Sequence, residues 1–235
     1  MAERLGDRLA MTAPDLPGHG RAPPWDRARD FHDQATALAR AAMPEAPPEG
    51  VHLIGHSFGA TVALRLALEG APVRTLTLVE PVLFAAAREA GHPAYAAHAA
   101  AFAEVEAAVA AGEPERAARV FSDLWGGGEP WEALPEAARA YQAERIGLIL
   151  AGTPALDRDR AGLLAPGRLE ALDRPVLLIE GSRSHPVAGA VLGALAARLP
   201  RARRVAVEGA GHMAPVTHPE AVAGAIRAEI EAVAA

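Results

Sequence analysis

Val51-His52-Leu53-Ile54-Gly55-His56-Ser57-Phe58-Gly59 sets a serine between two glycines, directly after a short apolar run. Residues 51–55 predict a compact strand, and residues 58–69 have the apolar spacing of a helix. Small residues around Ser57 allow a tight strand-to-helix turn that exposes the serine hydroxyl. The amide of Phe58 would then face that hydroxyl from the helix N-terminus, which favours negative charge. An ordinary glycine-flanked turn is the simpler alternative.

Short apolar runs alternate with longer helical patterns on both sides of this turn. Strands are predicted at residues 9–14, 73–79, 175–180 and 203–207, and helices at residues 30–43, 186–199 and 219–233. Asp30 is the predicted N-cap of the first of these helices. Strands that alternate with helices predict an α/β fold with a mainly parallel sheet and flanking helices.

The strand pattern stops between residues 84 and 172. This segment is helical in pattern and is broken at residues 91–93, 112, 126–128 and 152–154. A helical block inserted after one strand predicts a cap over the carboxyl ends of the strands, where ligands bind in open α/β sheets. We therefore expect a core of residues 1–83 and 173–235, with residues 84–172 as a helical cap.

Composition narrows the class of protein. Of the 235 residues, 51% are hydrophobic and 22% are charged, as in a folded globular protein. No apolar run is long enough to span a membrane, the first residues lack a signal-peptide core, and cysteine is absent, so we expect a cytoplasmic protein. The net charge of −6 argues against nucleic-acid partners. We therefore expect a small-molecule substrate and a monomer or homodimer.

Residue usage also limits the cofactor chemistry. The chain contains no lysine, which excludes a Schiff-base lysine and a P-loop lysine, and the lack of cysteine excludes thiolate catalysis. His92, His98, Asp157 and Asp159 do not have the spacing of metal ligands, and no phosphate-binding loop is evident. No metal and no cofactor is therefore predicted.

A serine nucleophile needs a histidine base that is oriented by an acid. Of nine histidines, His212 is the best placed, because Gly209-Ala210-Gly211-His212-Met213-Ala214-Pro215 lies between the last predicted strand and the last helix. Such a loop would reach the same carboxyl edge of the sheet as Ser57. A surface-loop histidine is the alternative, and His185 and His218 compete from less suitable positions.

Three ordered motifs resemble those of the α/β-hydrolase superfamily. They are Asp15-Leu16-Pro17-Gly18-His19-Gly20, the Gly-x-Ser-x-Gly turn at residues 55–59, and Gly209–His212 followed by Pro219-Glu220. The resemblance implies an α/β-hydrolase fold with an inserted helical cap, in which Ser57 is the nucleophile, His212 the base and the Phe58 amide an oxyanion donor. Substrate chemistry varies widely on this fold and is not implied.

The acid departs from the commonest pattern of that superfamily. Ser184 stands where an aspartate is usual, and a hydroxyl cannot stabilise an imidazolium as a carboxylate does. Some relatives take the acid from the end of the strand that follows the nucleophile helix, where this chain has Glu80. A charged residue that closes an apolar strand needs a partner, so we assign Glu80 as the acid and Glu180 as the second candidate. An ion pair with an arginine is the alternative role of Glu80.

Substrate contacts are expected from the aromatic residues of the cap. Trp125 and Phe84 are candidates to line an apolar pocket, although core packing of the cap is the commoner role for residues at helical spacing. His56 is a third candidate because it adjoins Ser57, although a structural role is the simpler interpretation.

The resemblance also indicates a gap near the N-terminus. The superfamily takes its second oxyanion amide from a loop after an earlier strand, marked by His-Gly, and neither precedes Asp15. That strand would lie between those at residues 9–14 and 51–55. We therefore expect N-terminal strands to be missing, either because the start is misassigned or because the chain is truncated and poorly active.

Serine chemistry of this kind indicates a hydrolase that cleaves a small apolar ester, thioester, lactone or amide through an acyl-enzyme. Two alternatives stay open. One is a carbon–carbon bond hydrolase or a haloperoxidase-like enzyme that uses the same three residues. The other is a non-catalytic ligand-binding member of the fold. A serine in place of an aspartate nucleophile argues against dehalogenase and epoxide-hydrolase chemistry.

Overall fold

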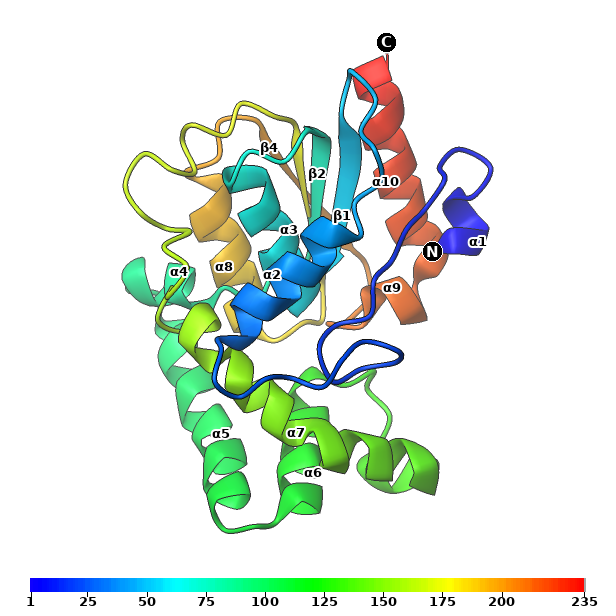
Figure 1. The fold of residues 1–235 in the computed structure, drawn as a ribbon. Coiled ribbons are helices and arrows are strands. Elements are labelled where there is room, and N and C mark those ends of the chain that lie inside the picture. Colours follow the sequence, from blue (N-terminus) through cyan, green and yellow to red (C-terminus); the bar gives the residue numbers. More distant parts are fainter. Residues whose placement is uncertain (235) are drawn as a thin grey trace.

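Four parallel strands form the central sheet of the computed structural model, which describes residues 1–234 (Figure 1). They are β1 (Val51–His56), β2 (Val73–Val79), β3 (Val176–Gly181) and β4 (Ala202–Val207), in the order β1-β2-β3-β4. Val79 lies opposite both His56 and Ile179, so the strands end along one edge of the sheet. The α/β fold with a parallel sheet is therefore confirmed.

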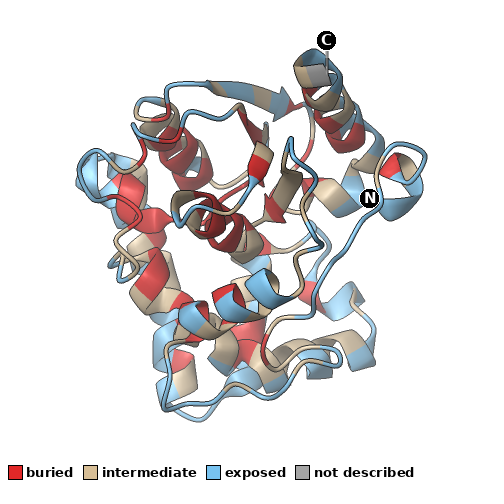
Figure 2. Ribbon diagram, turned by 45° about the horizontal axis from the view of Figure 1, so that its top comes forward, coloured by how far each residue is buried: buried red, intermediate tan, exposed pale blue. Residues whose placement is uncertain are grey.

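Helices cover both faces of this sheet (Figure 1). One face carries α3 (Phe58–Leu68) and α8 (Pro186–Ala196), with α2 (Phe31–Ala41) against α3, and the other carries α10 (Pro219–Ala234) with the short α1 (Ala2–Leu5) beside it. The Asp30 carboxylate accepts the amide of Asp33, which confirms the predicted N-cap. Figure 2 shows that buried residues are concentrated where the helices face the strands.

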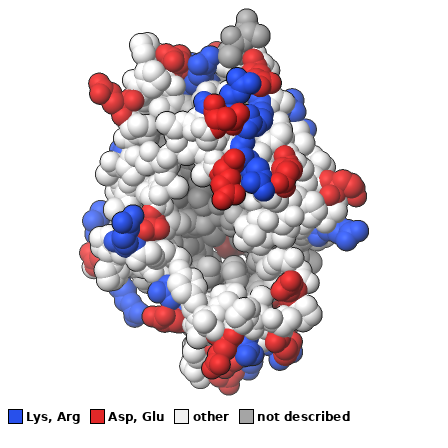
Figure 3. Space-filling view, turned by 90° about the vertical axis from the view of Figure 1, so that its right-hand side faces the viewer, with Lys and Arg blue, Asp and Glu red and all other residues white. Residues whose placement is uncertain are grey.

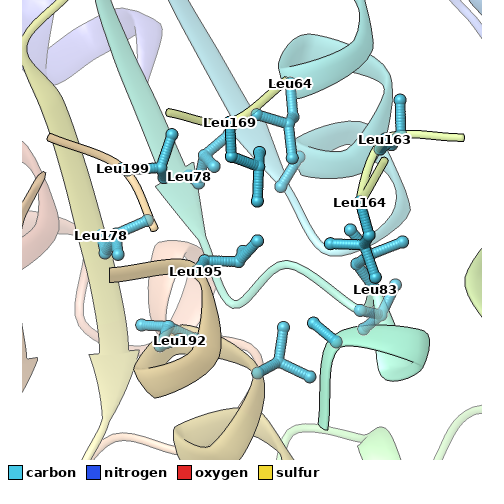
Figure 4. Close-up of a cluster of buried hydrophobic side chains, with 14 of the residues drawn as sticks. Leu64, Leu78, Leu83, Leu163, Leu164, Leu169, Leu178, Leu192, Leu195 and Leu199 are labelled. Atoms are coloured by element: carbon cyan, nitrogen blue, oxygen red, sulfur yellow. The ribbon is translucent and has the colours of Figure 1, made fainter. Parts of the chain in front are cut away.

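Alternate residues of the strands supply two separate cores. Leu78 and Leu178 point toward α3 and α8, where they join the cluster of leucines drawn in Figure 4. Leu177 and Ile179 point toward α10. All four side chains are fully buried, so truncation of Leu178 to alanine would cost about 2–5 kcal/mol of stability. This packing fixes where the strands end, and thereby the place of the residues that follow them.

Five helical elements form a helical insertion between β2 and β3. Its elements are α4 (Phe84–Glu89), α5 (Pro93–Ala110), α6 (Pro114–Trp125), η1 (Trp131–Ala133) and α7 (Glu136–Leu156). Helices α5, α6 and α7 pack around a core of their own that includes Val105, Trp131 and Ile146. They lie beyond the edge at which the strands end (Figure 1). Among the described residues, no helix combines the length and the apolar composition that crossing a membrane requires.

The strand predicted at residues 9–14 is wrong. This segment is irregular and most of its side chains are exposed, Met11 among them. Leu9 packs near α10 at one end, and Leu16 lines a cavity at the other. The chain between them therefore crosses the surface and has no apolar face to bury. As a result, β1 pairs with β2 alone within residues 1–234.

The helix break predicted at residues 152–154 is also wrong, because α7 continues through it. An added Cβ on Gly152 would lie 3.3 Å from Cε2 of Phe58, so this glycine allows close packing instead of ending the helix. Pro154 lies in the last turn, where the loss of one amide hydrogen bond is tolerated, and the amide of Asp157 still donates to a helix carbonyl.

Candidate active site

Ser57 occupies a sharp turn between β1 and α3. Its backbone has φ 55° and ψ −123°, and a positive φ is uncommon for any residue other than glycine. The turn brings the two elements so close that a Cβ on Gly55 would lie 2.4 Å from the carbonyl oxygen of Gly59. A Cβ on Gly59 would contact nothing within 4 Å. Of the two glycines, Gly55 is therefore the one that the turn requires.

His212 joins Ser57 to Glu80. It lies in the loop between β4 and the short helix α9 (Ala214–Thr217). Its Nε2 is 2.9 Å from the Ser57 hydroxyl oxygen, and its Nδ1 is 3.1 Å from Oε2 of Glu80. The three residues singled out in the sequence thus form one continuous hydrogen-bonded chain.

The Glu80 carboxylate beside Nδ1 determines which nitrogen of the neutral His212 ring carries the proton. A carboxylate can only accept, so the neutral ring carries its proton on Nδ1 and leaves a lone pair on Nε2. That lone pair faces the Ser57 hydroxyl, which can donate to it. This is the arrangement in which an imidazole removes a proton from a serine.

Glu80 is completely buried at the end of β2. Its backbone has φ 49°, which turns the side chain out of the strand and toward His212. Besides His212, the carboxylate accepts the amide of Gly181 at 2.7 Å and the hydroxyl of Ser184 at 2.6 Å. Burial by itself would raise the pKa of Glu80, but these three hydrogen bonds outweigh it and hold that pKa below its ordinary value. The carboxylate is therefore ionised near neutral pH.

Ser184 has a part in the site that the sequence did not reveal. It stands at the position where the resemblance led us to expect an aspartate, and its hydroxyl donates to Oε1 of Glu80. A hydrogen bond to an ionised acceptor is stronger than one between neutral groups. The residue at the position of the usual acid thus donates a hydrogen bond to the candidate acid on the neighbouring strand. Its position relative to Gly181 was the available signal.

The amide of Phe58 is the candidate donor to an oxyanion. Phe58 is the first residue of α3, and amides in the first turn of a helix have no partner within that helix. Together with the positive end of the helix dipole, such an amide stabilises a negative charge that develops beside Ser57. The Phe58 ring lies on the cavity wall.

A cavity opens directly above Ser57 and His212. It contains about 740 Å³ of empty space, open solvent at its mouth included. Trp125 and Phe84, both predicted to contact a substrate, line it, and the Trp125 ring lies edge-on to the His212 ring at 4.8 Å. Phe102 and Phe121, also among the aromatic residues of the predicted cap, line it as well. Further apolar lining residues, which the sequence did not single out, include Leu16, Phe31, Leu148 and Ile149.

The face seen in Figure 3 is hollowed between the α10 side of the molecule and the helical insertion. Charged side chains of both signs gather mainly over α1 and α10, where arginines and carboxylates form ion pairs such as Arg4 with Glu220 and Arg227 with Asp7. The cavity lining is mostly apolar, so it suits uncharged parts of a ligand.

His56, the third candidate for substrate contact, is not among the residues that line the cavity. Its Nε2 donates to the backbone carbonyl of His212 at 2.9 Å, and the two rings lie 5.0 Å apart. Burial lowers the pKa of the His56 imidazole, which keeps the ring neutral near pH 7. His56 therefore holds the His212 loop in place from behind, as its simpler interpretation suggested.

The competing residues are engaged elsewhere. His218 contacts the Thr217 hydroxyl at 2.9 Å, and His185 caps the start of α8. Glu180, the second candidate for the acid, forms an ion pair with Arg204 at 2.6 Å. Within residues 1–234, no three histidine or acidic side chains gather closely enough to hold a metal ion.

Comparison with known proteins identifies the family. A model of the alpha/beta hydrolase family matches residues 1–225. The pimeloyl-[acyl-carrier protein] methyl ester esterase of Xanthomonas campestris pv. campestris is 30% identical over an alignment of 241 positions, gaps included, that covers 96% of this chain and 86% of that protein.

Two further likenesses are more limited. The dihydrolipoyllysine-residue acetyltransferase component of the acetoin cleaving system of Cupriavidus necator is 40% identical over 90 residues, or 37% of this chain and only 24% of that protein. The 2-hydroxy-6-oxo-6-phenylhexa-2,4-dienoate hydrolase of Rhodococcus sp. strain RHA1 superposes with a TM-score of 0.70 at 18% identity, over 97% of this chain and 82% of its own. The fold, the family model and the full-length relative agree: the chain is a hydrolase that belongs to the alpha/beta hydrolase family.

Proposed function

We propose that the protein is a serine esterase that cleaves a small, mainly apolar ester through an acyl-enzyme. The observation that carries this proposal is the hydrogen-bonded chain from the buried Glu80 through His212 to Ser57, whose Ser57 end lines a mostly apolar cavity. An ester is the preferred substrate class because the full-length relative is a methyl ester esterase. Thioesters, lactones and amides follow the same chemistry with different leaving groups.

The first half of the reaction forms the acyl-enzyme. His212 Nε2 accepts the hydroxyl proton as Ser57 Oγ attacks the ester carbonyl carbon, and the carbonyl oxygen becomes an oxyanion beside the Phe58 amide. Glu80 stays ionised and stabilises the imidazolium. The tetrahedral intermediate then collapses. The bond to the leaving oxygen breaks, and that oxygen takes the proton from His212.

The second half returns the enzyme to its starting state. A water molecule gives a proton to His212 Nε2 and attacks the carbonyl carbon of the acyl-enzyme. The second tetrahedral intermediate releases the carboxylic acid, and Ser57 Oγ recovers its proton from His212. In this scheme the helical insertion acts as a cap, because residues of α5, α6 and α7 close the cavity over the serine and hold the apolar part of the substrate.

The test is hydrolysis of a series of p-nitrophenyl esters and alkyl methyl esters of rising acyl length. We expect turnover by the wild-type protein with a preference for short to medium apolar chains, and loss of about 10³-fold or more of kcat in Ser57→Ala. Circular dichroism shows whether that variant is folded. A folded wild type that hydrolyses none of the esters would contradict the proposal, and so would a Ser57→Ala variant with wild-type activity.

A further inference from the structure

One carboxylate lies on the wall of the mostly apolar cavity. Asp157 lies just beyond the last residue of α7, one turn after Thr153, and both residues line the cavity that contains Ser57. The catalytic scheme above gives Asp157 no part. A charged group that faces an apolar cavity loses hydration, so its presence there needs an explanation.

The surroundings of Asp157 leave the carboxylate poorly satisfied. Its one hydrogen-bond partner within residues 1–234 is the Tyr95 hydroxyl, at an O–O distance of 3.3 Å that is long for such a bond. It forms no ion pair with a described residue, and it caps the C-terminus of α7, where the helix dipole disfavours negative charge. Burial raises the pKa of the Asp157 carboxyl, and this effect outweighs the hydrogen bond from Tyr95, which lowers that pKa. The charge of Glu106 adds a smaller rise, which Arg88 and Arg158 oppose.

Asp159 provides an internal contrast two residues along the chain. Both of its carboxylate oxygens accept backbone amides at 2.8 Å, from Leu163 and from Leu164, so that side chain has a complete structural role. Asp157 has no comparable set of donors. A hydrogen-bond donor on a bound ligand would supply what is lacking.

We propose that Asp157 determines specificity by binding a hydrogen-bond donor, either a hydroxyl or an ammonium group, at the far end of the substrate's acyl chain. The inference deepens the proposed esterase function and rests on it. Tyr95 acts as a positioning residue, because its hydroxyl holds one carboxylate oxygen and leaves the other for the ligand. A free carboxylate at the same end of the chain would be repelled by Asp157 and is the least suitable group.

The kinetic test compares methyl esters of matched acyl length that end in a methyl, hydroxyl, ammonium or carboxylate group. For the wild type we expect kcat/KM to be about tenfold or more higher for the hydroxyl and ammonium esters than for the methyl-ended ester, and lowest for the carboxylate. Asp157→Leu should lose that preference and gain activity on the methyl-ended ester. Asp157→Asn should retain part of the preference for the hydroxyl but lose that for the ammonium, which separates the two donors.

The matched control is Asp123→Asn, an exposed carboxylate on α6 outside the cavity, which should leave every ratio unchanged. A wild type with equal kcat/KM for the methyl, hydroxyl and ammonium esters at all chain lengths would overturn the proposal. An equal loss of activity toward all four esters in Asp157→Leu would also overturn it.

A binding experiment separates this inference from the proposed function. Calorimetry of the Ser57→Ala protein with the same esters measures recognition without turnover. We expect the hydroxyl and ammonium esters to bind about tenfold or more tightly than the methyl-ended ester, and this difference to vanish when Asp157→Leu is added. Selective binding without wild-type turnover would refute the esterase function alone, whereas turnover without selective binding would refute the role of Asp157.

Discussion

Glu80 and Glu180 lie at the ends of neighbouring strands, yet their surroundings differ completely. The register of β2 and β3 sets Val79 opposite Ile179, and each glutamate is the next residue of its own chain segment. Glu80 and Glu180 therefore occupy equivalent positions on neighbouring strands. Glu80 is fully buried and accepts three hydrogen bonds, one of them from His212. Glu180 stays in its strand and forms an ion pair with Arg204, whose side chain is partly exposed.

The difference originates in the backbone. Glu80 has φ 49°, so the chain leaves β2 there and the side chain turns into the loop region above the sheet edge. Glu180 keeps the alternation of β3, which directs its side chain toward α8, where a Cβ on Gly189 would lie 3.2 Å from Oε2. A glutamate at the end of a strand is therefore not enough to identify the candidate acid. What distinguishes Glu80 from Glu180 is the direction in which the backbone leaves the strand and the hydrogen-bond donors around the carboxylate.

The largest effect should come from neutralising the two glutamates in turn. Glu80→Gln should lower kcat about 10³- to 10⁴-fold, because an amide no longer holds the His212 proton on Nδ1 or stabilises the imidazolium. Glu180→Gln removes only a partly exposed ion pair and should leave kcat within about twofold of wild type. Steady-state kinetics on an activated ester measures both. Similar losses in the two variants would remove the distinction between them.

The second prediction moves the acid from one strand end to the other. The Ser184 hydroxyl lies 2.6 Å from Oε1 of Glu80, so a carboxylate at residue 184 can enter the space that Glu80 vacates. Glu80→Ala/Ser184→Asp should therefore recover about tenfold in kcat relative to Glu80→Ala alone. A double variant no more active than Glu80→Ala would show that the exit of β2 is the one place from which an acid reaches His212.

A smaller effect is expected from Ser184 itself. Ser184→Ala removes one donor from the buried carboxylate and should lower kcat about tenfold, the equivalent of about 1.4 kcal/mol. Ser184→Thr keeps a hydroxyl and should restore most of the activity. The pH dependence of kcat gives a second readout, since Glu80 loses a hydrogen bond that lowers its pKa. Equal kinetics for the alanine and threonine variants would contradict this role.

The smallest expected effect is on the pH dependence of stability. The pKa of Glu80 lies below its ordinary value of 4.5, so its ionised form adds stability that is present above pH 4.5 and is lost as the pH falls further. Urea unfolding followed by tryptophan fluorescence should show a shallower acid loss in Glu80→Gln than in wild type. Burial lowers the pKa of His32 and of His98 from 6.5 to about 4, so the stability that they lose as the pH falls is lost between about pH 6.5 and pH 4. That loss is the same in both proteins and cancels in the comparison.

Much of the fold could be predicted because local patterns and packing agree. The β-branched residues of β2 favour a strand, and most of its side chains are buried. Asp30 caps α2 as its residue type favours. Residues 9–14 carry no comparable apolar face, so the strand predicted there does not form. The break predicted at Gly152 fails because that glycine packs on the Phe58 ring, a contact between residues far apart in sequence.

The geometry of the candidate site was predictable where one residue carried the signal by itself. Ser57 and His212 could be named from their turn and loop, and Glu80 from a charge that closes an apolar strand. The role of Ser184 depends on a hydrogen bond across two strand ends, and that of Asp157 on a cavity built by distant helices. Both depend on tertiary contacts, which a single sequence does not reveal.

The most direct test is the rate at which a fluorophosphonate modifies Ser57, because that reaction needs no knowledge of the natural substrate. We predict rapid modification of the wild type and of Glu180→Gln, and modification at least about 100-fold slower in Glu80→Gln. Peptide mass spectrometry should place the adduct on Ser57 alone. Equal rates in the wild type and Glu80→Gln, or an adduct on another residue, would contradict the assignment of Ser57, His212 and Glu80 as the catalytic residues.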